Sequence, residues 1–203
     1  MEADWSVELG SDAPVIDQGW PGWIDICQDR SRIALLDEVR TFPPLEKALR
    51  WVLESNCGMV PTKCDFWTRD EPVDACEYDA DPGANSTTAN CFVDLMPQAA
   101  THWINLAWAE RWAEASIKKL QAIRCRNTRV EVVLRQAFND DLAFLGVSLY
   151  ISACGISTRQ ARSTLASALP HALRAICMVN ADRESAPGDG AQITMKVQSP
   201  AGE

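Results

Sequence analysis

Four acidic residues each lie between two apolar neighbours in the sequence: Asp25, Asp65, Asp94 and Glu131. Aspartate is depleted in β-strands, so acids in such alternating runs are unusual. If neighbouring strands present them on one face, the carboxylates raise one another's pKa and could transfer protons or hold a hard cation. Tyr150 would add a hydrogen-bond donor to that face. The interpretation we favour is simpler: these are solvated outward positions of strands, with Arg129 and Arg135 neutralising them.

A second group of acids lies in the polar segment between residues 69 and 88. Its members are Asp70, Glu71, Asp74, Glu77, Asp79 and Asp81. Such a cluster could bind a basic protein surface or a divalent cation, although the spacing does not fit the ligand ladder of an EF-hand. A solvated loop is the alternative that we favour. Trp20 is a further candidate for partner contact because exposed tryptophans anchor interfaces, although most of the tryptophans should pack in the core.

The thiols and imidazoles give no catalytic or metal motif. The chain has eight cysteines and two histidines, but no C-x-x-C pair and no close spacing of His102 or His171 with a cysteine. We therefore expect no metal, no cofactor and mostly buried, reduced thiols. Cys57 and Cys76 are the cysteines that we expect to be most exposed. Cys57 follows a predicted helix, whose dipole should raise its thiol pKa.

Composition and missing motifs narrow the function classes. The chain has 203 residues, a formal net charge of −9 and 47% hydrophobic residues, which is an ordinary globular mixture. The acidic balance argues against nucleic acid as a partner. We expect a cytoplasmic protein without a membrane segment, because the acidic N-terminus does not resemble an export signal. Walker A, G-x-G-x-x-G, G-x-S-x-G and H-E-x-x-H motifs are missing, which argues against common nucleotide enzymes and hydrolases.

Hydrophobic periodicity predicts the elements that must position these residues. Three strand–strand–helix blocks begin near residues 5, 60 and 129, and their second strands are expected at 23–27, 90–96 and 142–154. The first helix should follow Thr41, which we expect as its cap. The second should span roughly residues 102–123. The third should begin after Ser157, with Gln160 completing a capping box. Pro170 should kink or split the last helix.

The blocks predict an α+β fold: an antiparallel sheet with about three helices packed on one face. We expect one domain over residues 1–180 and a polar tail over 181–203, with a possible edge strand at 193–197. The other face of the sheet would then be open to solvent, a ligand or a partner.

These expectations favour a non-enzymatic protein-interaction module. An acidic inhibitor or immunity-type protein that covers a basic partner is one concrete form, and a homodimer is a further possibility. The alternative is an enzyme, or a small-ligand or metal-binding protein, that uses Asp65, Asp94, Glu131 and Tyr150 on the open sheet face.

Overall fold

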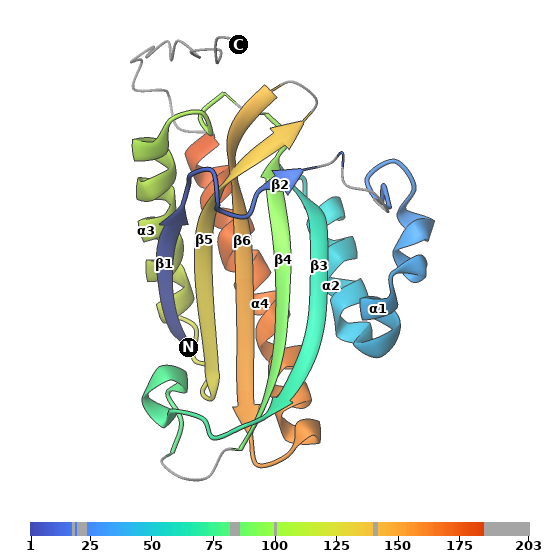
Figure 1. Cartoon of the computed structure of the whole chain (residues 1–203), viewed down its shortest axis with the longest axis vertical. Coiled ribbons are helices and arrows are strands. Elements are labelled where there is room, and N and C mark those ends of the chain that lie inside the picture. The colour runs from blue at the N-terminus through green and yellow to red at the C-terminus, as the bar shows by residue number, and fades with distance from the viewer. Residues whose placement is uncertain (18, 20–23, 82–85, 100, 140–141, 185–203) are drawn as a thin grey trace.

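The computed structural model describes residues 1–17, 19, 24–81, 86–99, 101–139 and 142–184. These residues form an α+β fold in which one mixed, mostly antiparallel sheet carries its long helices on one face (Figure 1). Trp20 and the proposed edge strand at 193–197 lie outside the described residues. Residues 181–184, which we placed in a polar tail, continue the last helix.

The sheet has the strand order β1-β5-β6-β4-β3, with the short β2 also paired to β5. Its strands are β1 (Glu2–Glu8), β2 (Ile16–Asp17), β3 (Met59–Asp70), β4 (Thr87–Pro97), β5 (Thr128–Asn139) and β6 (Leu142–Gly155). The predicted antiparallel pairing is confirmed for β3 to β6, but β1 and β2 run parallel to β5. Since β1 pairs with a strand more than a hundred residues later, no hairpin forces it to be antiparallel.

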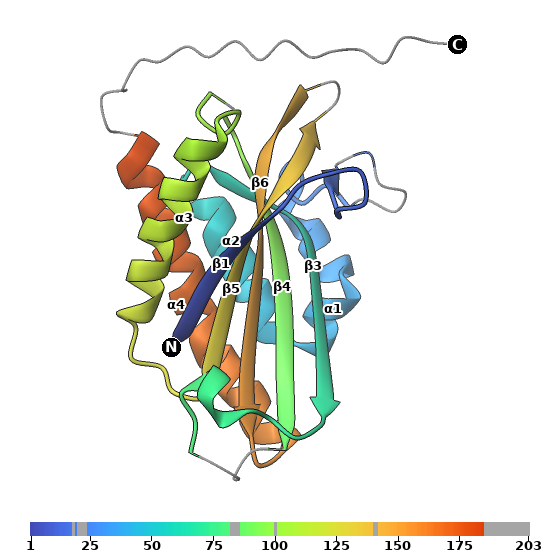
Figure 2. The same cartoon turned by 60° about the vertical axis from the view of Figure 1, so that its left-hand side comes forward.

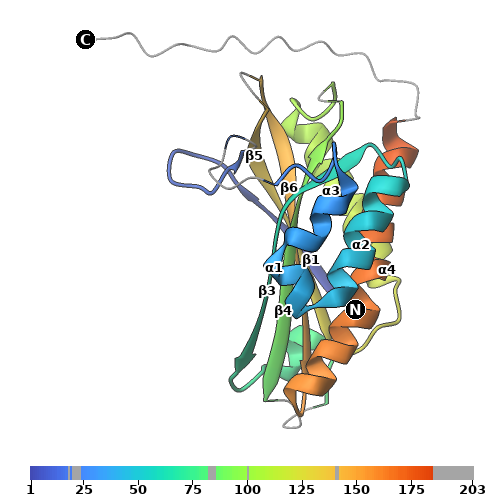
Figure 3. The ribbon, with the colours of Figure 1, turned by 90° about the vertical axis from the view of Figure 1, so that its right-hand side faces the viewer.

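Three long helices cover one face of the sheet, as the sequence predicts. They are α2 (Pro43–Glu54), α3 (Leu106–Gln121) and α4 (Thr158–Glu184), and Figure 3 shows them together on one side of the strands. Figure 2 shows α3 beside α4, which it contacts directly. Shorter turns of helix are η1 (Arg30–Leu35), α1 (Asp37–Thr41) and η2 (Ala75–Tyr78).

Local signals explain where these helices begin. The prolines of α2 occupy its first turn, where a missing N–H costs nothing, but its cap is Phe42 because Thr41 ends α1. Helix α3 begins at Leu106, later than expected, because the side chain of Asn105 accepts a hydrogen bond from the Trp108 N–H. At the start of α4, the Ser157 hydroxyl accepts from the Gln160 N–H, as predicted. Helix α4 continues through Pro170, so of the two predicted effects the split does not occur, and the kink stays a prediction.

The second strand of the first block is not where we expected it. Residues 26–28 form a turn, and Asp25 Oδ1 accepts hydrogen bonds from the N–H groups of Cys27 and Gln28 within it. An aspartate that bonds backbone two and three residues ahead favours a turn over a strand. The strand of that block is instead the two-residue β2. Asp25 is therefore not one of the strand acids.

The core lies between the sheet and the helices. Val93, Leu149 and Val132 on the central strands have no exposed surface, and neither have Trp103 and Trp112 on the helix side. The two indole rings meet edge to face at 4.9 Å. Among the described residues, no helix combines the length and apolarity needed to cross a membrane.

The junction of β6 with α4 gives a test of this packing. A Cβ added at Gly155 would lie 2.8 Å from the backbone nitrogen of Ala161, which cannot move without shifting α4. We expect Gly155→Ala to lower the free energy of unfolding by about 1–3 kcal/mol in urea titrations. Ile156→Ala, one residue along and 66% exposed, should change it by less than about 0.5 kcal/mol. Equal stability of both variants would contradict the close approach.

Candidate functional site

The strand register brings three predicted site residues into one row on the sheet face opposite the helices. Asp65 on β3 pairs with Phe92 on β4, Phe92 pairs with Tyr150 on β6, and Tyr150 pairs with Glu131 on β5. Asp94 lies two residues further along β4, on the same face. Asp65, Asp94, Glu131 and Tyr150 therefore share one face of the sheet, but they are spread across it and do not converge on one point.

The carboxylates of this row do not form a catalytic pair. Two strands separate Asp65 from Glu131, so their backbones lie about 14 Å apart across the sheet. Asp65 is exposed and accepts a hydrogen bond from the neighbouring Phe66 N–H. Two carboxylates must lie much closer than this to share a proton or flank one reacting bond.

Aromatic side chains occupy the space between these acids. Phe92 contacts Trp67 and Tyr150, with ring centroids 6.4 and 5.5 Å apart. The Lys63 ammonium lies 5.8 Å from the Phe92 centroid, and the Arg135 guanidinium lies 5.5 Å from that of Tyr150. We did not single out Trp67 or Phe92 from the sequence. The available signal was spacing: Trp67 is two residues from Asp65 on β3, and Phe92 is two residues from Asp94 on β4, which places each pair on one face of its strand.

A chain of hydrogen bonds crosses four strands beside this row. Arg135 on β5 donates to Glu8 on β1 through Nε and Nη2, at 3.1 and 2.7 Å. Its Nη1 donates to Ser148 Oγ and to the Tyr150 hydroxyl, both at 3.0 Å. Ser148 in turn donates to Asp94 Oδ1 at 2.5 Å. The chain links the half-buried carboxylate of Glu8 at the sheet edge to the buried carboxylate of Asp94 near the opposite edge.

Asp94 is the buried acid of this chain. It is only 5% exposed, and burial raises the pKa of its carboxyl group above the ordinary value. The hydrogen bond from Ser148 and the charges of Arg135 and Lys63 act in the opposite direction. Asp94 is therefore the predicted site residue whose environment differs most from that of a solvated strand position.

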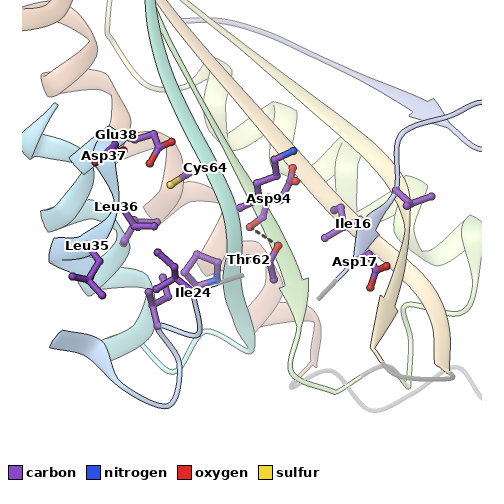
Figure 4. A pocket seen from close by; sticks show the side chains of 15 residues that line it. Ile16, Asp17, Ile24, Leu35, Leu36, Asp37, Glu38, Thr62, Cys64 and Asp94 are labelled. Carbon is purple, nitrogen blue, oxygen red and sulfur yellow. Dashed lines mark hydrogen bonds between the residues drawn. The ribbon is translucent and has the colours of Figure 1, made fainter. Parts of the chain in front are cut away.

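A pocket of about 360 Å³ opens beside Asp94 (Figure 4). It forms where the segments around β2 and between Ile24 and Glu38 meet β3 at a bulge between Pro61 and Lys63. At the bulge, Thr62 Oγ1 donates to the Asp94 carbonyl at 3.3 Å. Figure 4 shows Glu38 and Cys64 on one side of β3 and Asp94 on the other. The lining thus curves around the edge strand.

The pocket combines an apolar wall with excess negative charge. Its apolar residues are Val15, Ile16, Ile24, Ile26, Leu35, Leu36, Leu49 and Pro61. Its charged residues are Asp17, Asp37, Glu38 and Asp94 against Lys63. Burial, together with the charges of Glu38, Asp65 and Asp94, raises the pKa of the Cys64 thiol to about 12. The field in this part of the molecule therefore favours a cation and keeps Cys64 protonated.

The acids of the 69–88 segment are partly occupied by the chain itself. Glu77 pairs with Arg129 at 2.8 Å and Asp81 with Arg126 at 2.9 Å. Arg126 also donates to the backbone carbonyl of Asp79. The remaining acids have partners closer in sequence: Asp74 caps η2, Asp70 accepts from Thr87, and Glu71 lies 3.9 Å from Arg69. These ion pairs and hydrogen bonds therefore hold much of the segment against the beginning of β5 and of β4. Its predicted role in binding a basic partner stays a prediction.

Among the cysteines and histidines, Cys57 differs from expectation in its burial and in the direction of its pKa shift. Cys57 is buried, and its hydrogen bond with the Cys177 thiol lowers its pKa to about 6, opposite to the shift expected from the helix dipole. His102 stacks on Trp108 with centroids 5.4 Å apart. Within the described part of the chain, no three histidine, cysteine or acidic side chains are grouped to hold a metal ion.

Comparisons with known proteins add no family to this geometry. No protein-family model matches the chain, and neither does any curated protein or solved structure.

The buried state of Asp94 gives a pH test. Because its folded-state pKa is raised, the stability that Asp94 contributes is complete below the unfolded pKa of about 3.9 and is lost as pH rises through the folded pKa. We expect the free energy of unfolding of the wild type, minus that of Asp94→Asn, to fall over this range in urea titrations. Asp65→Asn, at an exposed position on the same face, is the matched control. A difference that rises with pH would contradict the burial of Asp94.

Proposed function

We propose that the protein is a non-enzymatic binding module for a basic segment of a partner protein. In this proposal, the pocket beside Asp94 takes a lysine or arginine side chain. The observation that carries it is the buried carboxylate of Asp94 at a pocket whose other charged residues include three more acids and one lysine. A cation entering such a pocket gains electrostatic energy at low local dielectric, where an interaction is screened less than at an exposed surface.

The rim of the pocket favours a partner larger than a single ion. Val15 and Leu35 line the pocket, yet they are 48% and 53% exposed. Large apolar side chains beside a polar cavity are typical of surfaces that another molecule covers. Apolar residues next to the partner's basic side chain would cover Val15 and Leu35 and exclude water from the new ion pair. The pocket volume suits one or two side chains.

The hydrogen-bond chain supports this role by holding the acid in place. Ser148 fixes one oxygen of Asp94, and Arg135 fixes Ser148. A partner cation therefore meets a carboxylate that is already oriented, so less conformational entropy is lost on binding. Affinity should rise as pH rises through the Asp94 pKa, because only the ionised carboxyl attracts the cation. An inhibitor or immunity-type protein that covers a basic enzyme is one form of this function.

A small amphipathic amine is the second candidate ligand. It is favoured by the apolar part of the pocket lining, which includes Ile16, Ile24 and Leu36. Pockets for small ligands commonly combine such walls with one or two oriented polar groups. This candidate uses the same carboxylate but does not need the exposed rim.

The test compares matched cationic and neutral probes. Amide chemical shifts would be followed by NMR during titration with a capped leucine–lysine–leucine tripeptide, and with the same peptide carrying norleucine in place of lysine. We expect the lysine peptide to shift residues that line the pocket and to bind at least about tenfold more tightly than the norleucine peptide. Its affinity should fall as salt increases, because Asp17 and Asp37 are exposed.

Variants separate the pocket from the rest of the acidic surface. Asp94→Asn should weaken the lysine peptide about tenfold or more, whereas Asp65→Asn, outside the pocket, should not. Leu35→Ser should weaken it, and Leu142→Ser is the control, because Leu142 is also exposed, at 66% against 53% for Leu35, but lies outside the pocket lining. Hexylamine that binds as tightly as the peptide, regardless of Leu35, would favour the small ligand. Binding that is unchanged in Asp94→Asn would contradict both candidates.

A further inference from the structure

Two cysteines that are distant in the sequence meet inside the molecule. Cys57 lies in the turn between α2 and β3, and Cys177 lies on α4, with their Sγ atoms 2.8 Å apart. Even carbon atoms, which are smaller than sulfur, make non-bonded contact at about 3.5–4.0 Å. The two side chains are 5% and 2% exposed. All eight cysteines lie in the described part of the chain, and this is the sulfur–sulfur contact that the structure records.

The backbone around the pair is held in this arrangement. Asn56 and Gly58, on either side of Cys57, both have positive φ angles, of 48° and 75°. The side chain of Asn180, about one turn beyond Cys177 on α4, donates to the Cys57 carbonyl at 2.8 Å. A tight turn tied to the helix at a second point leaves the two sulfur atoms little freedom to separate.

We propose that Cys57 and Cys177 form a disulfide bond that links the α2–β3 turn to α4. The oxidant is a small-molecule disulfide of the glutathione class. The Cys57 thiolate attacks one sulfur of that disulfide, and a mixed disulfide forms while the first small thiolate leaves. The Cys177 thiolate then attacks Cys57 Sγ and releases the second. The two protons lost by the cysteines are taken up by the two released small thiolates, which become thiols, so two protein thiols are oxidised and one small disulfide is reduced.

The electrostatic environment gives the two cysteines different roles in this exchange. The hydrogen bond with Cys177 lowers the pKa of Cys57 to about 6, while the same bond, burial and the charge of Cys57 raise that of Cys177. Cys57 is therefore the thiolate that attacks first, and Cys177 resolves the mixed disulfide. Because both are buried, the reagent reaches Cys57 only when the turn opens locally, so exchange should be slower than at the exposed Cys27 and Cys76.

The experiment incubates the folded protein with oxidised glutathione and maps its peptides by mass spectrometry without reduction. We expect a cross-linked peptide joining Cys57 to Cys177, lighter by two hydrogen atoms and free of glutathione, while Cys27 and Cys76 carry glutathione. Cys177→Ala should abolish the cross-link, whereas Cys154→Ala, another fully buried cysteine, should leave it intact. The wild-type map needs no variant to fold.

A thermal measurement tests the link between the turn and the helix. In a variant with serine at positions 27 and 76, oxidation should raise Tm by roughly 5–15 °C, because the bond closes a long loop in the unfolded chain. The same treatment should leave Tm unchanged when Cys177 is also replaced by alanine. Recovery of Cys57 and Cys177 as free thiols after the exposed cysteines have reacted completely would overturn the proposal, as would pairing of Cys57 with another cysteine.

Discussion

Burial of Asp94 is the constraint on which the open face of the sheet depends. A carboxylate that is 5% exposed is costly unless its oxygens and charge have partners. Ser148 supplies a hydrogen bond from the neighbouring strand β6, and Arg135 supplies a positive charge from β5, one strand further away. Arg135 is itself 8% exposed and needs the carboxylate of Glu8 on the next strand. Each buried polar side chain thus depends on the hydrogen bond from the next one, and the chain of hydrogen bonds ends at Glu8, which reaches solvent at the sheet edge.

This dependence connects the topology of the sheet to the pocket. Glu8 reaches Arg135 because β1 lies parallel to β5 with these two residues in register, and Ser148 reaches Asp94 because β6 and β4 are antiparallel neighbours in register. A shift of one residue in either pairing would turn these side chains to the helix face. The pocket therefore needs the whole strand order, including the parallel edge strand, although it is lined mainly by residues of the other edge.

Alternation along single strands predicts which face a side chain occupies, and Asp65, Tyr150 and Glu131 share one face of the sheet in the structure. Alternation along one strand carries no information on the order of the strands. It could not show that two strands separate Asp65 from Glu131, or that Glu8 meets Arg135. Pro61 was a signal for an edge strand or a bulge, and that bulge shapes the pocket. At Asp25, alternation predicts the wrong element. Its apolar neighbours indicate a strand, but its side chain accepts hydrogen bonds from backbone N–H groups two and three residues ahead, which favours a turn.

The most direct test of this arrangement is a pH titration of the Asp94 carboxyl carbon by NMR, with and without the capped leucine–lysine–leucine peptide. If Asp94 is buried and is the acid that recognises a cation, its midpoint lies above the ordinary value of about 3.9 in the free protein and falls when the peptide is present. An ordinary midpoint that the peptide leaves unchanged would contradict both the burial of Asp94 and its proposed role.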